Sequence, residues 1–276
     1  MINWRETPEP NDIAKLVQCY WFIEKESGDI TEQFPRLNPD PAGTLILAPK
    51  NQAYSYQNDN ELFEGTGDHW IYPNSQVFQL DHTDPFQIIG IKFHVGALYS
   101  LHTDPSPPII DEVKKAALER ITGLNLLEKS SLFELARNAS TDCASALNEL
   151  LMPWLSQIPL KKSSELCQKV VPRLAHTPVS KLGALFHASQ RTIERQFLSA
   201  TGLTLKQCQS MNRFESMLER LYLLEPDKVS WLDLVEEFGF SDQPHLIRYL
   251  KSMIGVTPNQ YLKDRNLTID TYGDFE

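Results

Sequence analysis

An internal repeat in the C-terminal third of the chain constrains the fold more than any other feature of the sequence. Residues 192–197 and the Gly-Leu-Thr at 202–204 correspond to residues 245–250 and the Gly-Val-Thr at 255–257. Each corresponding pair is 53 positions apart, since 246 − 193 = 53. The pairs are Ile193 and Leu246, Arg195 and Arg248, Phe197 and Leu250, Gly202 and Gly255, Thr204 and Thr257, and Gln207 and Gln260. One spacing kept over six pairs indicates a structural unit used twice.

Each copy of the repeat predicts two short helices separated by a tight turn. The first helices, Val179–His187 and Trp231–Phe238, carry apolar residues at helical spacing. The second helix begins at Ser189 in one copy and at Ser241 or Asp242 in the other, because these side chains accept hydrogen bonds from a first helical turn.

The second helix of each copy has one apolar face and one polar face. Ile193 and Phe197, like Leu246 and Leu250, stand four residues apart and share a face. The remaining positions point elsewhere and carry Arg191, Glu194 and Arg195, or Gln243, His245 and Arg248. This is the pattern of a helix-turn-helix, whose second helix lies in the major groove of DNA. Arginine can donate two hydrogen bonds to guanine, and glutamine can pair with adenine.

The stretch between the two copies predicts a connecting helix. Leu205, Cys208, Leu218 and Leu221 belong to one apolar stretch, long enough for a helix of roughly 30 Å at about 1.5 Å per residue. A rigid spacer of that length would set the two recognition helices about one DNA turn, roughly 34 Å, apart.

Residues 160–265 resemble the AraC/XylS family of transcription regulators. The first unit matches through Val179-Ser180-x-Leu182, Ser189-x-x-Thr192-Ile193-x-Arg195-x-Phe197 and Thr201-Gly202-Leu203-Thr204. The second unit matches through the more specific block Gly239-Phe240-Ser241-Asp242-Gln243, Arg248 and Gly255-Val256-Thr257-Pro258-x-Gln260-Tyr261.

The resemblance implies a DNA-binding domain of two helix-turn-helix units joined by a long helix, with RNA polymerase as a further partner. Its recognition helices would be residues 189–200 and 242–252, lying in successive major grooves of double-stranded DNA. The DNA-binding residues carried over by motif are Gln190, Arg191, Thr192, Glu194, Arg195, Gln243, Pro244, His245, Arg248 and Lys251.

The sequence departs from the family pattern at several positions. Gly183 and Val235 replace a small alanine in the first helices, and Leu250 replaces a phenylalanine in the second recognition helix. Glu194 would repel phosphate, although it can accept a hydrogen bond from cytosine. Glu236 and Glu237 also weaken the basic field, so we expect low nonspecific affinity for DNA.

The charge distribution agrees with a DNA-binding C-terminal domain in an acidic chain. The net charge is −10, but residues 160–265 hold 15 Lys/Arg against 11 Asp/Glu, a net +4. Residues 1–159 carry −11, and the acidic tail at 266–276 carries −3. We therefore predict an N-terminal domain at 1–159, a DNA-binding domain at 160–265 and a tail at 266–276.

The first 110 residues are broken by many prolines and predict short strands. The β-type runs are Val17–Glu24, Thr44–Ala48, Val77–Asp81 and Ile88–Phe93. Several short strands indicate a sandwich or a barrel. This half resembles the sensor half of some AraC-type regulators, with a β-barrel or cupin-like core. The match runs through Cys19–Glu24, Pro39-Asp40-x-x-Gly43-x-Leu45-Ile46 and Ile89–Phe93 followed by Gly96-Ala97.

A helical segment follows the strands and ends around Pro159. We predict helices at Asp111–Arg120, Leu124–Arg137 and Ala144–Leu155. The leucine-rich stripe from Leu124 to Leu155 suits either a dimer interface or packing against its own domain. We favour the dimer contact, because family members often pair through the N-terminal half. The fold class is therefore α+β, with a β-barrel or cupin-like domain and a helical segment before an all-α domain.

Other chemistries find little support in the sequence. Cys19, Cys143, Cys167 and Cys208 form no paired motif and are expected to be buried thiols. His69, His82, His94 and His102 have no metal-ligand spacing, so we expect structural histidines and no metal or cofactor. Trp21, Phe22, Tyr54, Tyr56 and Trp70 could line a ligand pocket, but aromatic residues on strands are usually core.

These observations predict a sequence-specific DNA-binding regulator that is not an enzyme, because no nucleophile or phosphate-binding motif is present. Its N-terminal domain would sense a small molecule of unknown identity or form a homodimer. The start of the chain lacks a signal-peptide pattern and no run could span a membrane, so we expect a cytoplasmic protein. One alternative is a cupin-like binding protein or enzyme with a vestigial DNA module. Another is a regulator whose acidic half sequesters a protein partner.

Overall fold

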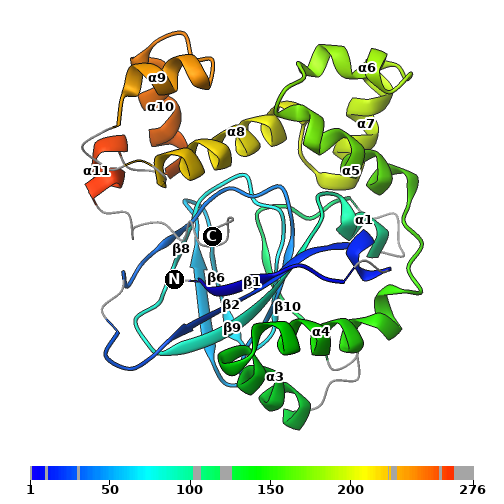
Figure 1. Cartoon of the computed structure of the whole chain (residues 1–276), viewed down its shortest axis with the longest axis vertical. Coiled ribbons are helices and arrows are strands. Elements are labelled where there is room, and N and C mark those ends of the chain that lie inside the picture. The colour runs from blue at the N-terminus through cyan, green and yellow to red at the C-terminus, as the bar shows by residue number, and fades with distance from the viewer. Residues whose placement is uncertain are drawn as a thin grey trace.

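The computed structural model describes residues 2–9, 12–29, 32–101, 107–118, 126–222, 224, 229–254 and 257–263. A sheet-rich N-terminal part lies against a helical C-terminal part (Figure 1). No helix among these residues is both long and apolar enough to cross a bilayer. The predicted tail at 266–276 lies outside the described residues.

The described residues of the N-terminal part form ten strands in two sheets. The strands are β1 (Ile2–Glu6), β2 (Val17–Lys25), β3 (Arg36–Leu37), β4 (Thr44–Leu47), β5 (Ala53–Gln57), β6 (Leu62–Thr66), β7 (His69–Ile71), β8 (Phe78–Leu80), β9 (Phe86–Phe93) and β10 (Val113–Lys115). Six strands form one sheet in the order β1-β2-β9-β4-β7-β10, and four form the other in the order β3-β8-β5-β6. All strand pairs in both sheets are antiparallel. The four predicted β-type runs correspond to β2, β4, β8 and β9.

Alternating side chains on the central strands separate two cores. On β2, Cys19, Trp21 and Ile23 face the four-stranded sheet and pack with Phe78 and Leu80 of β8. The two sheets therefore form a sandwich, one of the two arrangements that the short strands allow. The barrel expectation needs correction, because neither sheet closes on itself within the described residues.

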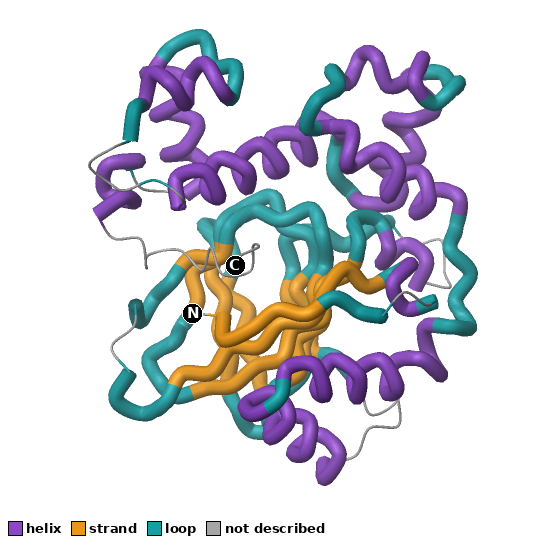
Figure 2. The backbone as a smooth tube through the Cα atoms, viewed as in Figure 1, coloured by secondary structure: helices purple, strands orange, loops and turns teal. Residues whose placement is uncertain are grey.

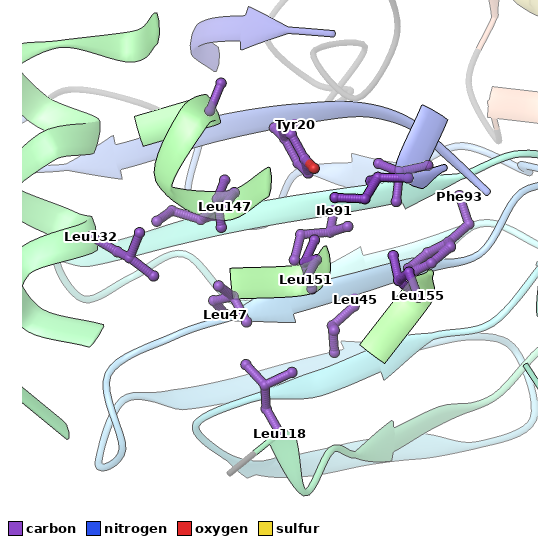
Figure 3. Packing of buried hydrophobic residues seen from close by; sticks show 14 of the residues in the cluster. Tyr20, Leu45, Leu47, Ile91, Phe93, Leu118, Leu132, Leu147, Leu151 and Leu155 are labelled. Carbon is purple, nitrogen blue, oxygen red and sulfur yellow. The ribbon is translucent and has the colours of Figure 1, made fainter. Parts of the chain in front are cut away.

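The opposite face of the six-stranded sheet is covered by helices. These are α1 (Ala97–Leu101), α3 (Leu126–Asn138) and α4 (Ser140–Leu155), with a 3-10 turn at Ile13–Lys15. Figure 3 shows Leu147, Leu151 and Leu155 of α4 pointing onto the sheet. The leucine stripe thus packs on its own domain, and these leucines are not free for the dimer contact that we favoured.

The predicted helix at Asp111–Arg120 is wrong over residues 111–117. Residues 113–115 form the edge strand β10, which pairs antiparallel with β7. Val113 packs into the core between the sheets, whereas Lys114 and Lys115 are exposed. Helix-forming residues are thus overridden by the sheet edge, which supplies hydrogen bonds that the segment cannot make alone.

The C-terminal part consists of helices (Figure 2). They are α5 (Lys162–Leu174), a 3-10 turn at Val179–Lys181, α6 (Leu182–Leu185), α7 (Gln190–Thr201), α8 (Leu205–Tyr222), α9 (Trp231–Glu237), α10 (Gln243–Ile254) and α11 (Pro258–Lys263). The units with α6 and α7 and with α9 and α10 stand at opposite ends of α8 (Figure 1). Each unit has its own apolar core.

The repeat extends to the way its helices begin. The Thr204 hydroxyl accepts a hydrogen bond from the Gln207 backbone N–H at 3.2 Å, at the start of α8. The Thr257 hydroxyl accepts from the Gln260 backbone N–H at 3.3 Å, at the start of α11. Identical caps 53 residues apart support the view that the two units share one architecture. The paired glycine at position 255 lies outside the described residues.

The two parts of the molecule contact each other directly. The Ser164 hydroxyl on α5 donates to the Gly96 carbonyl at 2.8 Å and accepts from the Ser100 hydroxyl at 2.7 Å. Gly96 has no room for a side chain, because an added Cβ would lie 2.8 Å from Cys167. At the other end, the Arg36 guanidinium donates to the Ile254 carbonyl of α10 at 2.6 Å. Both helix-turn-helix units thus contact the N-terminal part.

Candidate nucleic-acid interface

The first candidate recognition helix is α7, and its N-terminus is fixed by a cap. The Ser189 hydroxyl accepts a hydrogen bond from the Thr192 backbone N–H at 3.1 Å, as expected for Ser189 before the helix. Ile193 and Phe197 are completely buried in the core of the unit. Arg191, Glu194 and Arg195 are exposed, so the helix presents its charged face to solvent.

Two other predicted contact residues of α7 are engaged within the helix. The Thr192 hydroxyl lies 2.7 Å from the Ser189 hydroxyl and belongs to the cap. The Gln190 amide donates to the Glu194 carboxylate at 2.9 Å. The Glu194 carboxylate therefore has a hydrogen-bond donor on its own helix, and the two arginines outnumber it among the exposed charges of this face.

The second candidate recognition helix, α10, repeats this arrangement. Asp242 caps it by accepting from the His245 backbone N–H at 2.7 Å, which decides between the two expected caps, Ser241 and Asp242. Leu246, Leu250 and Ile254 are completely buried. The exposed residues of α10 include all five predicted contacts, Gln243, Pro244, His245, Arg248 and Lys251. Leu250 fills the position of the expected phenylalanine without a change of face.

The side chain of His245 is held in place by its neighbours. The Ser241 hydroxyl lies 3.1 Å from His245 Nδ1, and the Phe240 ring meets the imidazole edge-on at 5.2 Å between centroids. The hydrogen bond from the His245 backbone lowers the pKa of the Asp242 carboxyl, so the cap stays ionised. The imidazole therefore sits at the N-terminal end of the helix, where recognition helices contact base edges.

The turns of the two units differ in length. In the first unit, Phe186 follows α6 as its C-cap, and the next helix cap, Ser189, comes three residues later. In the second unit, Phe238 is the C-cap of α9, and Asp242 comes four residues later. Each turn contains one residue in the left-handed region, His187 at φ 50° and Gly239 at φ 64°. The first helices of the units are thus 52 residues apart, and the recognition helices keep the 53-residue spacing.

An arginine of α8 joins the second unit to the connecting helix, although no motif in the sequence points to it. The guanidinium carbon of Arg213 lies 3.7 Å from the ring centroid of Phe240 and 5.7 Å from that of Tyr249. The Tyr249 hydroxyl in turn donates to the Ser210 carbonyl on α8. This cation–π stack joins α10 to the connecting helix. Only the fold brings these rings to Arg213, so no local spacing could have revealed it.

The remaining candidates of the sequence analysis lie in the N-terminal part. His69 and His94 hydrogen-bond to backbone carbonyls of Gly67 and Ala14, and His102 lies outside the described residues. Among the described residues, no group of three or more His, Cys, Asp or Glu could hold a metal ion. All four cysteines are buried free thiols, as predicted.

The fold places the five aromatic residues that could have lined a pocket in different environments. Tyr54 and Tyr56 line a cavity at one end of the sandwich. Trp21 and Phe22 are core residues on opposite faces of β2. Trp70 packs against Phe93 beneath the helices, with ring centroids 5.5 Å apart. The strand alternation thus decides which aromatic residues face the cavity.

Comparisons with known proteins match both parts of the chain. The model of a helix-turn-helix domain family matches residues 182–264. The model of a domain of unknown function, DUF6597, matches residues 5–114. No curated protein matches the chain.

Three solved structures are similar to the chain at low identity. ToxT from Vibrio cholerae has 8% identity and a TM-score of 0.49, over 88% of this chain and 96% of that chain. Unsaturated fatty acid bound wild-type ToxT from Vibrio cholerae strain SCE256 has 12% identity and a TM-score of 0.46, over 89% and 94%. The AraC-like transcriptional activator CuxR has 10% identity and a TM-score of 0.29, over 77% and 85%.

The helix-turn-helix family match covers both repeated units and the helix between them. It includes the two capped helices, their buried apolar faces and their exposed basic residues. Residues 182–264 therefore form a helix-turn-helix domain, and the chain is a DNA-binding transcription regulator.

Proposed function

We propose that the regulator reads DNA through α7 and α10, lying in successive major grooves. The contacts from α7 are Gln190, Arg191, Thr192, Glu194 and Arg195, and those from α10 are Gln243, Pro244, His245, Arg248 and Lys251. The observation that carries the proposal is the shared design of the two helices. Each buries one face in its own unit and leaves basic and amide side chains exposed.

The connecting helix supports simultaneous binding of both units. Helix α8 has 18 residues and is about 27 Å long at 1.5 Å per residue. With the helices packed at its two ends, this length is compatible with two recognition helices about one DNA turn, roughly 34 Å, apart. A single duplex face can then accept both helices without a change in the fold.

The exposed residues suggest a division of roles. Arg195 and Arg248 occupy equivalent positions in the repeat and suit bidentate contacts to guanine. Lys251 suits a phosphate contact, which adds affinity without sequence preference. Thr192 acts through the Ser189 cap, so its role is to orient the start of α7. Glu194 can accept from cytosine when its hydrogen bond with Gln190 opens.

The N-terminal part is proposed to be the sensor. It contains a cavity of about 490 Å³, within the size range of small-molecule sites. It also contacts both helix-turn-helix units, through Gly96 and Ser100 at α5 and through Arg36 at α10. A ligand that alters this part can therefore change DNA affinity. A domain boundary near residues 159 and 160, a homodimer and contact with RNA polymerase stay proposals of the same kind.

The test is binding to a duplex that the protein itself selects from a random-sequence pool. Fluorescence anisotropy with this duplex and a scrambled one, at two salt concentrations, separates specific from electrostatic binding. We expect Arg195→Ala and Arg248→Ala each to lose roughly 1–3 kcal/mol on the selected duplex. Their binding to the scrambled duplex should change much less.

Arg173→Ala is the matched control, because Arg173 is exposed on α5, outside both recognition helices. It removes the same charge and should keep the preference for the selected duplex. Circular dichroism checks that each variant is folded. Unchanged binding in both Arg195→Ala and Arg248→Ala would overturn the assignment of α7 and α10 as recognition helices.

A further inference from the structure

A cavity opens at one end of the sandwich, and all of its lining residues belong to the N-terminal part. Its volume is about 490 Å³. Its walls come from the β4–β5 connection, from β5 and β6, and from the β8–β9 connection at residues 81–85. Aromatic rings of Tyr54, Tyr56 and Phe86 line it, together with the imidazoles of His69 and His82. The cavity is therefore rich in ring surface.

The inner wall of the cavity contains a buried polar pair with fixed protons. His69 Nδ1 lies 2.8 Å from the Gly67 carbonyl, which can only accept, so Nδ1 carries the proton. His69 Nε2 then accepts from the Tyr56 hydroxyl at 2.9 Å. Burial lowers the pKa of His69 to about 4, so the imidazole is neutral at pH 7. The pair lies in the cavity wall that borders the hydrophobic core between the two sheets.

Tyr54 offers an aromatic face to the cavity. Its ring stacks on the His69 imidazole, with 3.9 Å between centroids and 32° between planes. The ring also lies over the β6 backbone, because a Cβ at Gly65 would come within 2.4 Å of the Tyr54 hydroxyl. Tyr54 is only half-buried, so part of its side chain is accessible from the cavity.

Hydrogen bonds hold the walls of the cavity in place without a ligand. Lys25 reaches from β2 and donates to the His82 and Thr83 carbonyls. On the other wall, the Gln52 side chain pairs with the Gln87 backbone, accepting at 3.0 Å and donating at 3.2 Å. The site is therefore preorganised, which lowers the entropic penalty of binding.

The charges around the cavity are one-sided. Among the described residues, its lining includes Glu64, Asp81 and Asp84 but no lysine or arginine. All three residues are exposed, so their carboxylates contribute at the solvent-facing rim of the cavity. Burial lowers the pKa of His82 to about 3, so neither imidazole supplies a positive charge at pH 7. Lys25 is a cation behind the 81–85 loop, where it donates to the His82 and Thr83 carbonyls.

A second cavity has lining charges of both signs. It has a volume of about 870 Å³ and lies between the 3-10 turn at Ile13–Lys15, the end of α4 and the start of α5. Its walls carry Asp12 and Glu165 but also Lys15 and Lys169. Balanced charges favour neither sign of ligand, so this cavity gives no basis for choosing a ligand class.

We propose that the Tyr54 cavity is the effector site and that its ligand is a small organic cation with an apolar body. The carboxylates at the rim attract the positive charge, and the ring faces of Tyr54, Tyr56 and Phe86 stabilise it by cation–π contact and burial. An anionic ligand would find no basic side chain among the described residues of the lining. The inference rests on the proposed sensor role of the N-terminal part.

The test compares probes of similar shape and different charge. Isothermal titration calorimetry on the full chain at pH 7.5 uses 2-phenylethylammonium and choline as cations. The uncharged comparator is 3-phenylpropan-1-ol, and the anion is 3-phenylpropionate. We expect saturable binding of at least one cation, at least tenfold tighter than either comparator. Absence of binding by both cations, or tighter binding of 3-phenylpropionate, would overturn the proposal.

Variants then locate the bound cation. Tyr54→Ala should weaken binding at least tenfold, whereas Tyr54→Phe, which keeps the ring, should stay within about threefold. The pair Glu64→Gln and Asp84→Asn should weaken binding at least fivefold. The matched control is Asp59→Asn with Glu61→Gln, which removes two exposed carboxylates from the far end of the β5–β6 hairpin. Equal losses in the two charge pairs would refute binding in the cavity.

A DNA measurement separates this inference from the proposed function. Anisotropy on the selected duplex is repeated with the bound cation, and we expect at least a threefold change in affinity that Tyr54→Ala abolishes. Cation binding without a change in DNA affinity would refute the effector role while leaving DNA reading intact. Loss of DNA reading in the arginine experiment would refute the proposed interface, whatever the calorimetry shows.

Discussion

Single residues show how the N-terminal part tolerates polar groups in its interior. The Tyr20 hydroxyl donates to the Asn148 side chain of α4 at 2.9 Å, and the Tyr56 hydroxyl donates to His69. Both tyrosines are nearly or completely buried. A buried polar group without a partner costs about 1–3 kcal/mol, so each of these groups is paired. Of these groups, His69 is the one whose ordinary pKa, about 6.5, lies near neutral pH.

The neutral state of His69 makes stability depend on pH. Its folded pKa of about 4 is below the ordinary value of 6.5, so the unfolded chain binds the proton more readily. This contribution is complete above pH 6.5 and is lost as the pH falls towards 4. We expect the free energy of unfolding, measured by urea titration, to fall by roughly 3 kcal/mol or less over that interval from this residue.

Replacement of His69 isolates its share. His69→Gln can still donate to the Gly67 carbonyl but cannot titrate. The variant should be less stable at pH 7.5, with a smaller decrease between pH 6.5 and 4. Its remaining slope includes His82, whose pKa is also lowered by burial. An identical pH profile in the variant and the wild type would contradict the neutral, buried state of His69.

At the scale of elements, α4 is an integral part of the sandwich. Its leucines pack on the face of the six-stranded sheet formed by Tyr20, Leu45 and Ile91 (Figure 3). Periodicity alone predicts the helix and its apolar stripe, but it does not say which surface the stripe covers. The six-stranded sheet covers the leucine stripe, because the sheet face that carries Tyr20, Leu45 and Ile91 is apolar.

Truncation of the stripe should therefore affect stability and not association. We expect Leu147→Ala and Leu151→Ala each to lower the free energy of unfolding by about 2–5 kcal/mol, because both side chains are fully buried. The oligomeric state, measured by sedimentation at fixed concentration, should stay the same. Glu149→Ala on the exposed face of α4 is the control, within about 0.5 kcal/mol of wild type.

A change in oligomeric state with little change in stability would restore the dimer interpretation of the stripe. The two measurements are made on the same samples, so that a destabilised variant is not mistaken for a dissociated one. Sedimentation is therefore carried out well below the unfolding midpoint of each variant.

At the scale of the whole molecule, the N-terminal part and the helix-turn-helix units are joined by a few specific contacts. Ser164 of α5 connects to Gly96 and Ser100, and the Lys161 backbone N–H donates to the Ser100 hydroxyl at 2.9 Å. These groups are buried, so the contact is sensitive to the loss of one hydroxyl. It is the clearest path by which the N-terminal part can influence α7.

Removal of the Ser164 hydroxyl should loosen this junction. Ser164→Val leaves the Gly96 carbonyl and the Ser100 hydroxyl short of partners, and we expect about 1–3 kcal/mol of destabilisation. Hydrogen exchange should accelerate in α1 and α5 while the amides of β2 and α10 keep their protection. Ser163→Val, on the same helix, supplies the control. Uniform acceleration over the whole chain would argue against a local junction.

The sequence determined the parts of this protein that depend on local order. The 53-residue repeat, the helix caps and the alternation of apolar and polar faces are properties of neighbouring residues, and the helical units follow from them. The same local patterns identified which side chains of α7 and α10 are exposed. Their contacts with DNA bases stay predictions, because the operator is not encoded in the chain.

Tertiary structure decided what depends on residues far apart in the sequence. Residues 113–115 form a strand because they pair with the edge of β7. The sheets form a sandwich because both faces of β2 and β9 are apolar, and one face packs on the helices while the other packs on the second sheet. The cavity arises where β4–β6 and the 81–85 connection meet, and Arg213 stacks on rings brought from α10 and its preceding turn. Periodicity defines a face of an element, but only the packed chain defines the partner of that face.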